Sequence, residues 1–269
     1  MADARFPGGG HAHSGGLEEA VARSLVTDLD DLGAFLQGRL RTAGLVGAAF
    51  AAAAARLADG AGRAAGGAGR LPGRAGRAGR TSGAEGYGSQ AGDTAAGGAA
   101  AGGTAAEVLG ALDVASWARL DAELDARTPS PAQRATSRAQ GRATLRAARQ
   151  AWPSPVLDAL VAVHPRPHHP LLLGALVGLD GGTPADAARC AGYLALTGPA
   201  SAAVRLLGLD PLAVNALVVA LGPDLAHVVG TATAAGVVAA LPAPGAPLLD
   251  LMAQSHVRHH REKVRLFAS

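Results

Sequence analysis

Apolar residues recur every three or four positions along much of this chain, the spacing of one face of an α-helix. Leu17 and Val21 follow this spacing near the start. A Thr-Asp-Leu-Asp stretch at 27–30 then predicts a helix N-cap, and the apolar spacing resumes through 32–40. The range 45–57 continues as an alanine-rich helix, because alanine has the highest intrinsic helix propensity.

Four prolines directly follow a Ser, Thr or Asp, a pair that predicts an N-cap and the first position of a helix. These pairs begin at Ser130, Ser154, Thr183 and Asp210, and Asp186 gives the third a variant of the capping box. No alternating strand pattern and no hairpin turn signal is present. The sequence therefore predicts an all-α fold, a multi-helix bundle of roughly ten short-to-medium helices.

The range 58–106 interrupts the helical pattern with alternating Gly, Ala and Arg. So little apolar surface cannot offset the entropy lost on ordering, and we expect a disordered low-complexity insertion. Its arginines could contact RNA as Arg-Gly segments do, although no aromatic residues are interleaved with them for stacking on bases.

Composition limits how the core can be built. Aromatic residues make up only 3% of the chain, whereas Gly occurs 38 times. Alanine and leucine must then supply the core, and the helices should pack closely on small side chains. The single cysteine, Cys190, excludes an internal disulfide and fits a reducing, cytoplasmic location. Its alanine-rich surroundings favour a small buried hydrophobe over a reactive thiol.

Membrane and nucleic-acid functions receive little support. Mean hydropathy is +0.20, but Asp and Pro residues interrupt the most apolar region, 206–251, before it reaches the ~18 residues of a membrane span. The start of the sequence shows no basic region followed by an apolar run, so we expect no secretory signal. A formal net charge of +3 is too small and too dispersed to imply nucleic acid by itself.

No credible set of catalytic residues emerges, because no nucleophile elbow and no phosphate-binding loop is present. Histidine is the residue type that could bind a metal such as nickel. His256 and His260 are four positions apart and would share one helical face, so they are candidate ligands. Two ligands without a third make only a weak site, and surface or partner contacts are the alternative.

The two ends of the chain carry the most informative motifs. Residues 6–18 read Phe-Pro-Gly-Gly-Gly-His-Ala-His-Ser-Gly-Gly-Leu-Glu, and 265–269 read Arg-Leu-Phe-Ala-Ser. An apolar pair beside positive charge at a chain end is typical of an anchor that orders in a partner's groove. A frayed terminus is the simpler alternative.

These ends resemble the UreF family of urease accessory proteins. That family opens with Leu-Pro-x-Gly-Gly-x-x-His-Ser-x-Gly-Leu-Glu and closes with Arg-Leu-Phe-x-Ser. Interior segments are also similar, and they lie at 120–124, 134–142, 169–174 and 202–206.

The resemblance implies a non-enzymatic helical protein that pairs as a homodimer and has no stably bound cofactor. It implies an adaptor that binds a UreD-like (UreH-like) accessory protein, recruits the GTPase UreG, and so helps deliver nickel to apo-urease. Carried over residue by residue, it predicts a partner-binding set made of Gly10, His13, Ser14, Gly16, Leu17, Glu18, Arg205, Arg265, Leu266, Phe267 and Ser269.

The expected organisation is a flexible arm at 1–14, a single helical domain at 15–255 and a partner-binding tail at 256–269. Two other functions remain open at this point. One is a free-standing, histidine-rich nickel-binding protein, and the other is a helical RNA-binding protein that acts through the insertion at 58–106.

Overall fold

The computed structural model describes residues 14–64 and 114–266. Every regular element in these ranges is helical, and none is a strand, which confirms the all-α prediction. The predicted arm at 1–14, apart from Ser14, and most of the insertion predicted at 58–106 lie outside the described residues. The first residues assigned to that insertion instead continue the preceding helix as far as Ala64.

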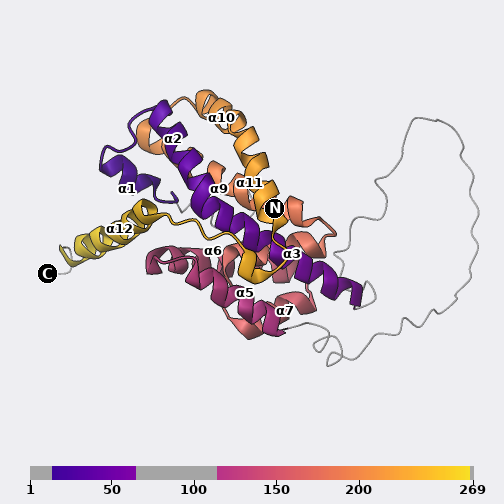
Figure 1. The fold of residues 1–269 in the computed structure, drawn as a ribbon. Coiled ribbons are helices and arrows are strands. Elements are labelled where there is room, and N and C mark those ends of the chain that lie inside the picture. The colour runs from indigo at the N-terminus through magenta and orange to yellow at the C-terminus, as the bar shows by residue number, and fades with distance from the viewer. Residues whose placement is uncertain (1–13, 65–113, 267–269) are drawn as a thin grey trace, which may run out of the picture.

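The helices form a bundle around α3 (Figure 1). α8 and α9 pack along α3, α11 packs on both α3 and α9, and α6 packs against α8. α5 contacts α7 and α3, while α12 packs against α6 and α1. The α-helices are α1 (Leu17–Ala22), α2 (Leu29–Arg39), α3 (Leu45–Ala64), α5 (Val114–Ala126), α6 (Pro131–Ala151), α7 (Pro155–Val163), α8 (His169–Leu179), α9 (Pro184–Leu207), α10 (Pro211–Ala220), α11 (Gly222–Ala234) and α12 (Pro247–Leu266).

The predicted N-caps are present at the predicted residues. The side chains of Ser130, Ser154 and Asp210 accept backbone N–H groups at the starts of α6, α7 and α10. Thr183 and Asp186 form a reciprocal capping box at the start of α9. These bonds satisfy N–H groups that have no partner within their own helix, so the sequence locates these helix starts correctly.

A π-helical turn, η2 (Leu40–Gly44), joins α2 to α3 without breaking the helix. The continuous stretch Leu29–Ala61 is 33 residues long and apolar enough to cross a membrane by length and composition, but 61% of its most apolar window is buried inside the protein. α8, α9 and α11 surround α3, so this stretch is the central core helix. In the apolar region 206–251, α10 and α11 are separate short helices that meet at 45°.

Small residues allow the central helices to approach closely. A Cβ atom added at Gly174 of α8 would lie 2.1 Å from the carbonyl oxygen of Ala51 and 2.8 Å from the Cβ of Ala54. One turn later, a Cβ at Gly178 would lie 2.6 Å from the carbonyl oxygen of Ala55. The backbones of α3 and α8 therefore meet across glycine on one side and alanine on the other, as the composition predicts.

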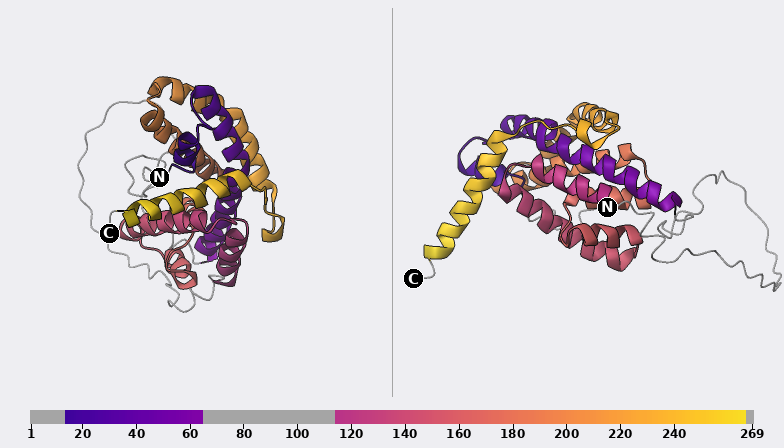
Figure 2. Two further views of the ribbon diagram at one scale, coloured as in Figure 1. Left: turned by 90° about the vertical axis from the view of Figure 1, so that its left-hand side faces the viewer. Right: turned by 60° about the horizontal axis from the view of Figure 1, so that its bottom comes forward.

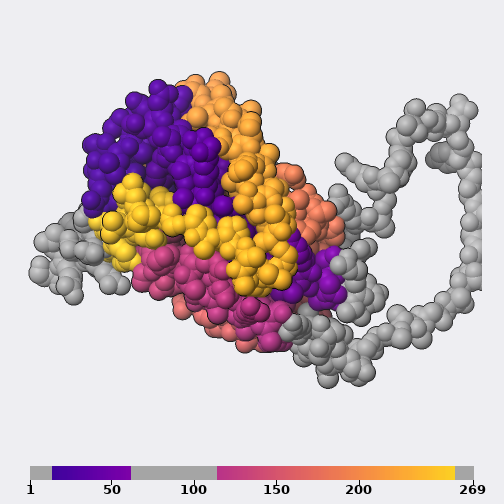
Figure 3. Space-filling model, viewed as in Figure 1, coloured from indigo at the N-terminus to yellow at the C-terminus, as the bar shows by residue number. Residues whose placement is uncertain are grey.

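The chain runs from α11 to α12 across one face of the molecule. This connection includes the 3-10 turn η3 (Val238–Ala240), which packs against α5. In the space-filling view the yellow connection lies between the indigo N-terminal helices and the magenta α5 and α6 (Figure 3). α12 then extends, and its C-terminal half points away from the other described helices (Figure 2).

The tail boundary expected at residue 256 falls inside α12, which continues without a break from Pro247 to Leu266. Leu249 and Met252 in its first half are buried in the core, whereas Leu251 is 68% exposed. The first half of α12 therefore belongs to the bundle, and the sequence expected for the tail is a direct helical extension of it.

Replacing Gly174 with alanine should destabilise the protein by about 1–3 kcal/mol or more, because the added methyl group overlaps the α3 backbone. Gly60→Ala is the matched control, because Gly60 is an exposed residue of α3 and nothing lies within 4 Å of a Cβ atom added to it. That change should stabilise the protein by roughly 0.5–1 kcal/mol. Urea denaturation measures both, and equal effects of the two substitutions would refute the close contact.

Candidate functional site

The described part of the N-terminal motif lies beside the first half of the helix that carries the C-terminal motif, because α1 packs against α12 (Figure 1). The Arg23 guanidinium at the end of α1 donates to Ser255 Oγ at 2.5 Å. Glu18 Oε2 lies 4.0 Å from His256 Nε2. A Cβ at Gly16 would meet Leu249 at 3.6 Å, an ordinary contact. The N-terminal motif therefore lies beside residues 249–256 of α12, whereas Arg265 and Leu266 lie at the far end of the same helix.

The turn that begins α1 requires the glycines of the N-terminal motif. Gly15 and Gly16 have φ angles of 63° and 98°, in the left-handed region that favours glycine. Ser14 then caps the helix: its carbonyl accepts the N–H of Leu17 at 3.2 Å, and its Oγ accepts the N–H of Glu18 at 3.2 Å. The motif is thus a capped turn whose shape presents Glu18 to solvent, at about half exposure.

The predicted partner-binding residues fall into different environments. Leu17 is fully buried, so its side chain belongs to the core and not to an exposed surface. Glu18 is exposed, as is Arg205 near the C-terminal end of α9 beside the 43% exposed Leu206. Arg265 and Leu266 are the last two residues of α12. Gly10, His13, Phe267 and Ser269 lie outside the described residues.

The candidate metal ligands His256 and His260 both lie on α12, at the predicted helical spacing. His256 is half-buried beside Glu18. Among the residues that the structure describes, no three His, Cys, Asp or Glu side chains are grouped to hold a metal ion. Cys190 is half-buried rather than fully buried, and desolvation raises the pKa of its thiol.

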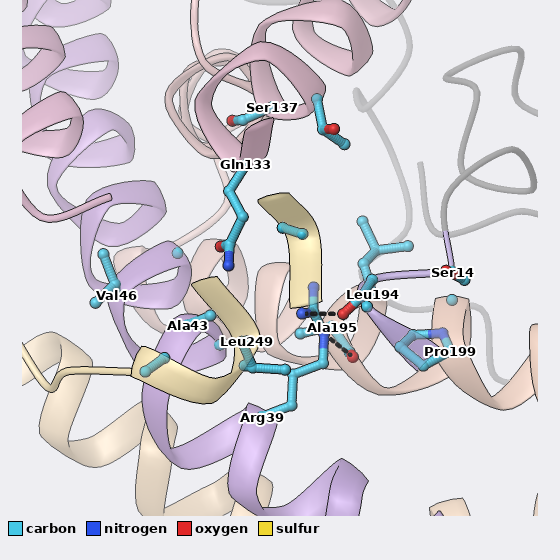
Figure 4. Close-up of a pocket in the computed structure, with 18 of the residues that line it drawn as sticks. Ser14, Arg39, Ala43, Val46, Gln133, Ser137, Leu194, Ala195, Pro199 and Leu249 are labelled. Atoms are coloured by element: carbon cyan, nitrogen blue, oxygen red, sulfur yellow. Dashed lines mark hydrogen bonds between the residues drawn. The ribbon is translucent and has the colours of Figure 1, made fainter. Parts of the chain in front are cut away.

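A cavity of about 840 Å³ lies beside the contact between α1 and α12, and Arg39 lies in its wall (Figure 4). Residues from α1, η2, α6, α9 and α12 line it, together with the connection before α12. Ser14, Gly15 and Gly16 of the N-terminal motif form one edge. Arg39 and this cavity are features that periodicity did not indicate, because an arginine in a helix is normally assigned to the solvent face.

Two carbonyl oxygens hold the Arg39 guanidinium. Its Nη1 donates to the carbonyl of Gly15 at 2.7 Å, and its Nε donates to the carbonyl of Ala195 at 3.3 Å (Figure 4). Ala195 can accept this bond because Pro199, four residues later in α9, has no N–H to donate to it. Desolvation lowers the pKa of Arg39 to about 10, so the guanidinium is charged at neutral pH.

The other charged groups near the cavity have partners. Glu19 is paired with Arg23 at 2.7 Å, and Arg127 is paired with Glu123. The Asp250 carboxylate accepts a hydrogen bond from Gln133 at 3.2 Å, and burial raises its pKa.

A buried polar network lies next to the cavity and joins α5, α6 and α8. Arg138 makes a two-point contact with Asp121 at 3.1 and 2.8 Å, and its Nη2 also bonds Asp125 at 2.8 Å. The ring of His168, which is 0% exposed, bonds Asp125 through Nε2 at 2.8 Å and Ser137 through Nδ1 at 3.0 Å. Ser137 Oγ also accepts the N–H of His169 at 3.3 Å. These bonds hold three helices together at the start of α8.

Burial and the nearby charge of Arg138 lower the pKa of His168, although Asp125 and Asp121 partly oppose the shift. Burial of Asp125 acts to raise the pKa of that carboxyl, but hydrogen bonds from His168 and Arg138 outweigh it and lower the pKa. The histidine is therefore held neutral beside an ionised carboxylate.

Known proteins with similar sequences identify the family. Residues 84–222 match the sequence model named UreF. The urease accessory protein UreF of Mycolicibacterium vanbaalenii is 39% identical over 269 residues, covering 100% of this chain and 96% of that protein. The protein of the same name from Mycobacterium tuberculosis H37Ra is 36% identical over 270 residues, with the same coverage. The chain belongs to the UreF family.

Membership in the UreF family confirms the resemblance seen in the end motifs. The region that matches the family model includes α5 to α10 and therefore Arg205 and the His168 network. The two end motifs lie outside that region, but the alignments to both UreF relatives cover the whole chain.

The pH dependence of stability tests the state of His168. In the unfolded chain this histidine takes up a proton as the pH falls below its ordinary pKa of 6.5. In the folded chain its pKa is lower, so it takes up the proton only at a lower pH. The free energy of unfolding should therefore fall below pH 6.5, by up to about 1.4 kcal/mol per pH unit. Urea denaturation at a series of pH values should show a smaller decrease for His168→Gln. An identical pH dependence in both proteins would contradict the prediction.

Proposed function

We propose that this chain is a non-enzymatic adaptor in urease maturation. It links a UreD-like (UreH-like) accessory protein to the GTPase UreG on apo-urease, so that nickel is inserted into the urease active site. Nickel is the delivered ion in this role and not a resident cofactor. The observation that supports the proposal is the contact between α1 and α12, which packs the described part of the N-terminal motif on the helix that carries the C-terminal motif.

The surface chemistry suits protein binding. Leu248 and Leu251 are 58% and 68% exposed. Both lie near the start of α12, in the half of this helix that packs on α1. α12 then carries Arg265 and Leu266 away from the bundle. An extended helix that ends in an apolar and basic segment can insert into a partner's groove, where apolar anchors supply most of the binding energy.

A homodimer is part of the same proposal. Leu212 and Val219 are 78% and 69% exposed on α10 and lie seven residues apart, which places them on one helical face. Covering such an apolar stripe with a second copy would remove it from water. The proposed location is the cytoplasm, which fits a chain with a single cysteine.

Truncation after Glu262, or Phe267→Ala, should abolish binding of the UreD-like protein. Burial of Leu266 and Phe267 could contribute ~1.5–3 kcal/mol each before ordering costs are subtracted. Folding should be nearly unchanged, because the buried residues Leu249 and Met252 of α12 precede the truncation. Pull-down with the UreD-like protein and far-UV circular dichroism measure the two effects.

Val237→Ala is the control for the tail variants, because Val237 is an exposed apolar residue that lies outside α12. It should bind the UreD-like protein with wild-type affinity. A truncated chain that still binds with unchanged affinity would show that the tail is not the anchor, and one that unfolds would show that the tail is part of the core.

Glu18→Lys should weaken UreG recruitment and lower urease activation, because it reverses the charge that the capped turn presents to solvent. The matched control is Asp158→Lys, a charge reversal at an exposed carboxylate of α7. Thermal denaturation should show similar folding for both variants, since an acidic residue in the first helical turn contributes only about 0.3–1 kcal/mol. Wild-type complex formation and urease activation by Glu18→Lys would remove this segment from the partner surface.

A further inference from the structure

The charge of Arg39 has no counter-charge among the described residues. Within the described ranges its guanidinium donates to the carbonyl oxygen of Gly15 through Nη1 and to that of Ala195 through Nε. Neither bond uses Nη2, and no carboxylate within the described ranges lies at ion-pair distance from this guanidinium. Desolvation lowers its pKa, and no acid among the described residues offsets that shift.

Arg39 is half-buried. A charged group that loses part of its water is costly unless an opposite charge or a full set of hydrogen bonds replaces that water. The carbonyl groups of Gly15 and Ala195 supply two hydrogen bonds, but they supply no negative charge. Arg39 lines the cavity of about 840 Å³, so an anion that enters the cavity can approach the guanidinium. We propose that this cavity is a binding site for a single carboxylate attached to an apolar body, with the carboxylate held by Arg39.

The walls of the cavity define the rest of the ligand. Apolar side chains of Val46, Leu194, Pro199 and Leu249 lie around Arg39 (Figure 4). The volume falls within the usual range of ligand pockets, about 300–1,000 Å³. An aliphatic or leucine-rich body can therefore be buried there, while its carboxylate makes a charge-assisted hydrogen bond to the guanidinium.

Acidic residues on the same cavity exclude multiply charged ligands. Glu18, Glu19 and Asp250 also line it. These groups repel a phosphate or a nucleotide, and a single guanidinium cannot neutralise two negative charges. A monocarboxylate is the anion that matches one unpaired cation in a largely apolar cavity with acidic edges.

The proposal rests on the geometry around Arg39 and not on the proposed adaptor function, so the purified full-length chain is sufficient for the test. Isothermal titration with octanoate, octan-1-ol and inorganic phosphate compares three probes. Octanoate should bind roughly tenfold to a hundredfold more tightly than octan-1-ol, the factor expected for a hydrogen bond to a charged group. Phosphate should not bind. Equal affinity for octanoate and octan-1-ol, or tighter binding of phosphate, would overturn the proposal.

Three variants locate the site. Arg39→Gln should reduce the preference for octanoate to about one. Arg41→Gln is the matched control, because Arg41 is two residues away and pairs with Asp224 at 2.6 Å outside the cavity. It should keep the wild-type preference. Leu194→Trp fills the apolar part and leaves Arg39 in place, so it should abolish octanoate binding even if Arg39→Gln fails to fold. Wild-type binding by Leu194→Trp would overturn the assignment.

The source of the carboxylate can be distinguished with a leucine-rich tetrapeptide that carries either a free or an amidated C-terminus. Preference for the free peptide over octanoate would identify the end of a protein segment as the ligand. Preference for octanoate would identify a small carboxylic acid. Equal affinity for the free and amidated peptides, together with no preference for octanoate over octan-1-ol, would refute carboxylate recognition.

Discussion

The close approach of α3 to α8 and α9 is the constraint on which the rest of this fold depends. A chain with 3% aromatic residues cannot fill wide gaps between helices with large side chains. It stabilises its core by bringing backbones together over glycine and alanine, so that many small contacts replace a few large ones. At Gly174 the α3 carbonyl oxygen already occupies the space of a Cβ atom, and no rotamer change can relieve that overlap. The arrangement of the central helices is therefore sensitive to single methyl groups.

Beside this tight core lies a region where one helical hydrogen bond is missing. Pro199 interrupts the hydrogen-bond ladder of α9, and the freed carbonyl of Ala195 accepts a hydrogen bond from Arg39 at the end of α2. Arg39 in turn bonds Gly15, where a Cβ atom would lie 2.8 Å from the guanidinium carbon. Immediately after Arg39 the helix adopts a π turn, a feature that often marks functional sites. A helix defect, a charged side chain and the N-terminal turn thus depend on one another.

Local sequence signals predicted the helix starts well, because a Ser-Pro or Asp-Pro pair acts within one turn of the chain. The capping box at Thr183 and Asp186 needs no tertiary contact to form. Trp117, Leu120 and Leu124 follow the apolar spacing of one helical face, and all three are buried in α5.

The remaining features could not be predicted from the sequence, because they depend on contacts between residues that are far apart along the chain. The role of Arg39 depends on Gly15 and Ala195, which are 24 and 156 positions away. In the sequence His168 is only a histidine between prolines, whereas its partners Asp125 and Ser137 lie on two other helices. Pro199 lies inside a helical pattern, so the sequence indicates that a carbonyl loses its helical hydrogen bond there. The sequence does not show that Arg39 is the group that donates to this carbonyl. Leu17 matched a family motif, and its burial shows that a matched motif residue can serve folding as well as binding.

The continuous α12 changes how binding at the C-terminal end should be understood. A free tail would lose about 1–2 kcal/mol of backbone entropy for each residue that a partner orders. A helix that already begins in the core at Leu249 and Met252 has lost much of that entropy on folding. Its attachment to α1 through Arg23 and Ser255 also fixes its direction relative to the N-terminal turn. In the proposed complex, a partner that binds the end of α12 meets a helix whose direction is already fixed. A change at the α1–α12 contact would then alter binding without changing the proposed anchor residues themselves.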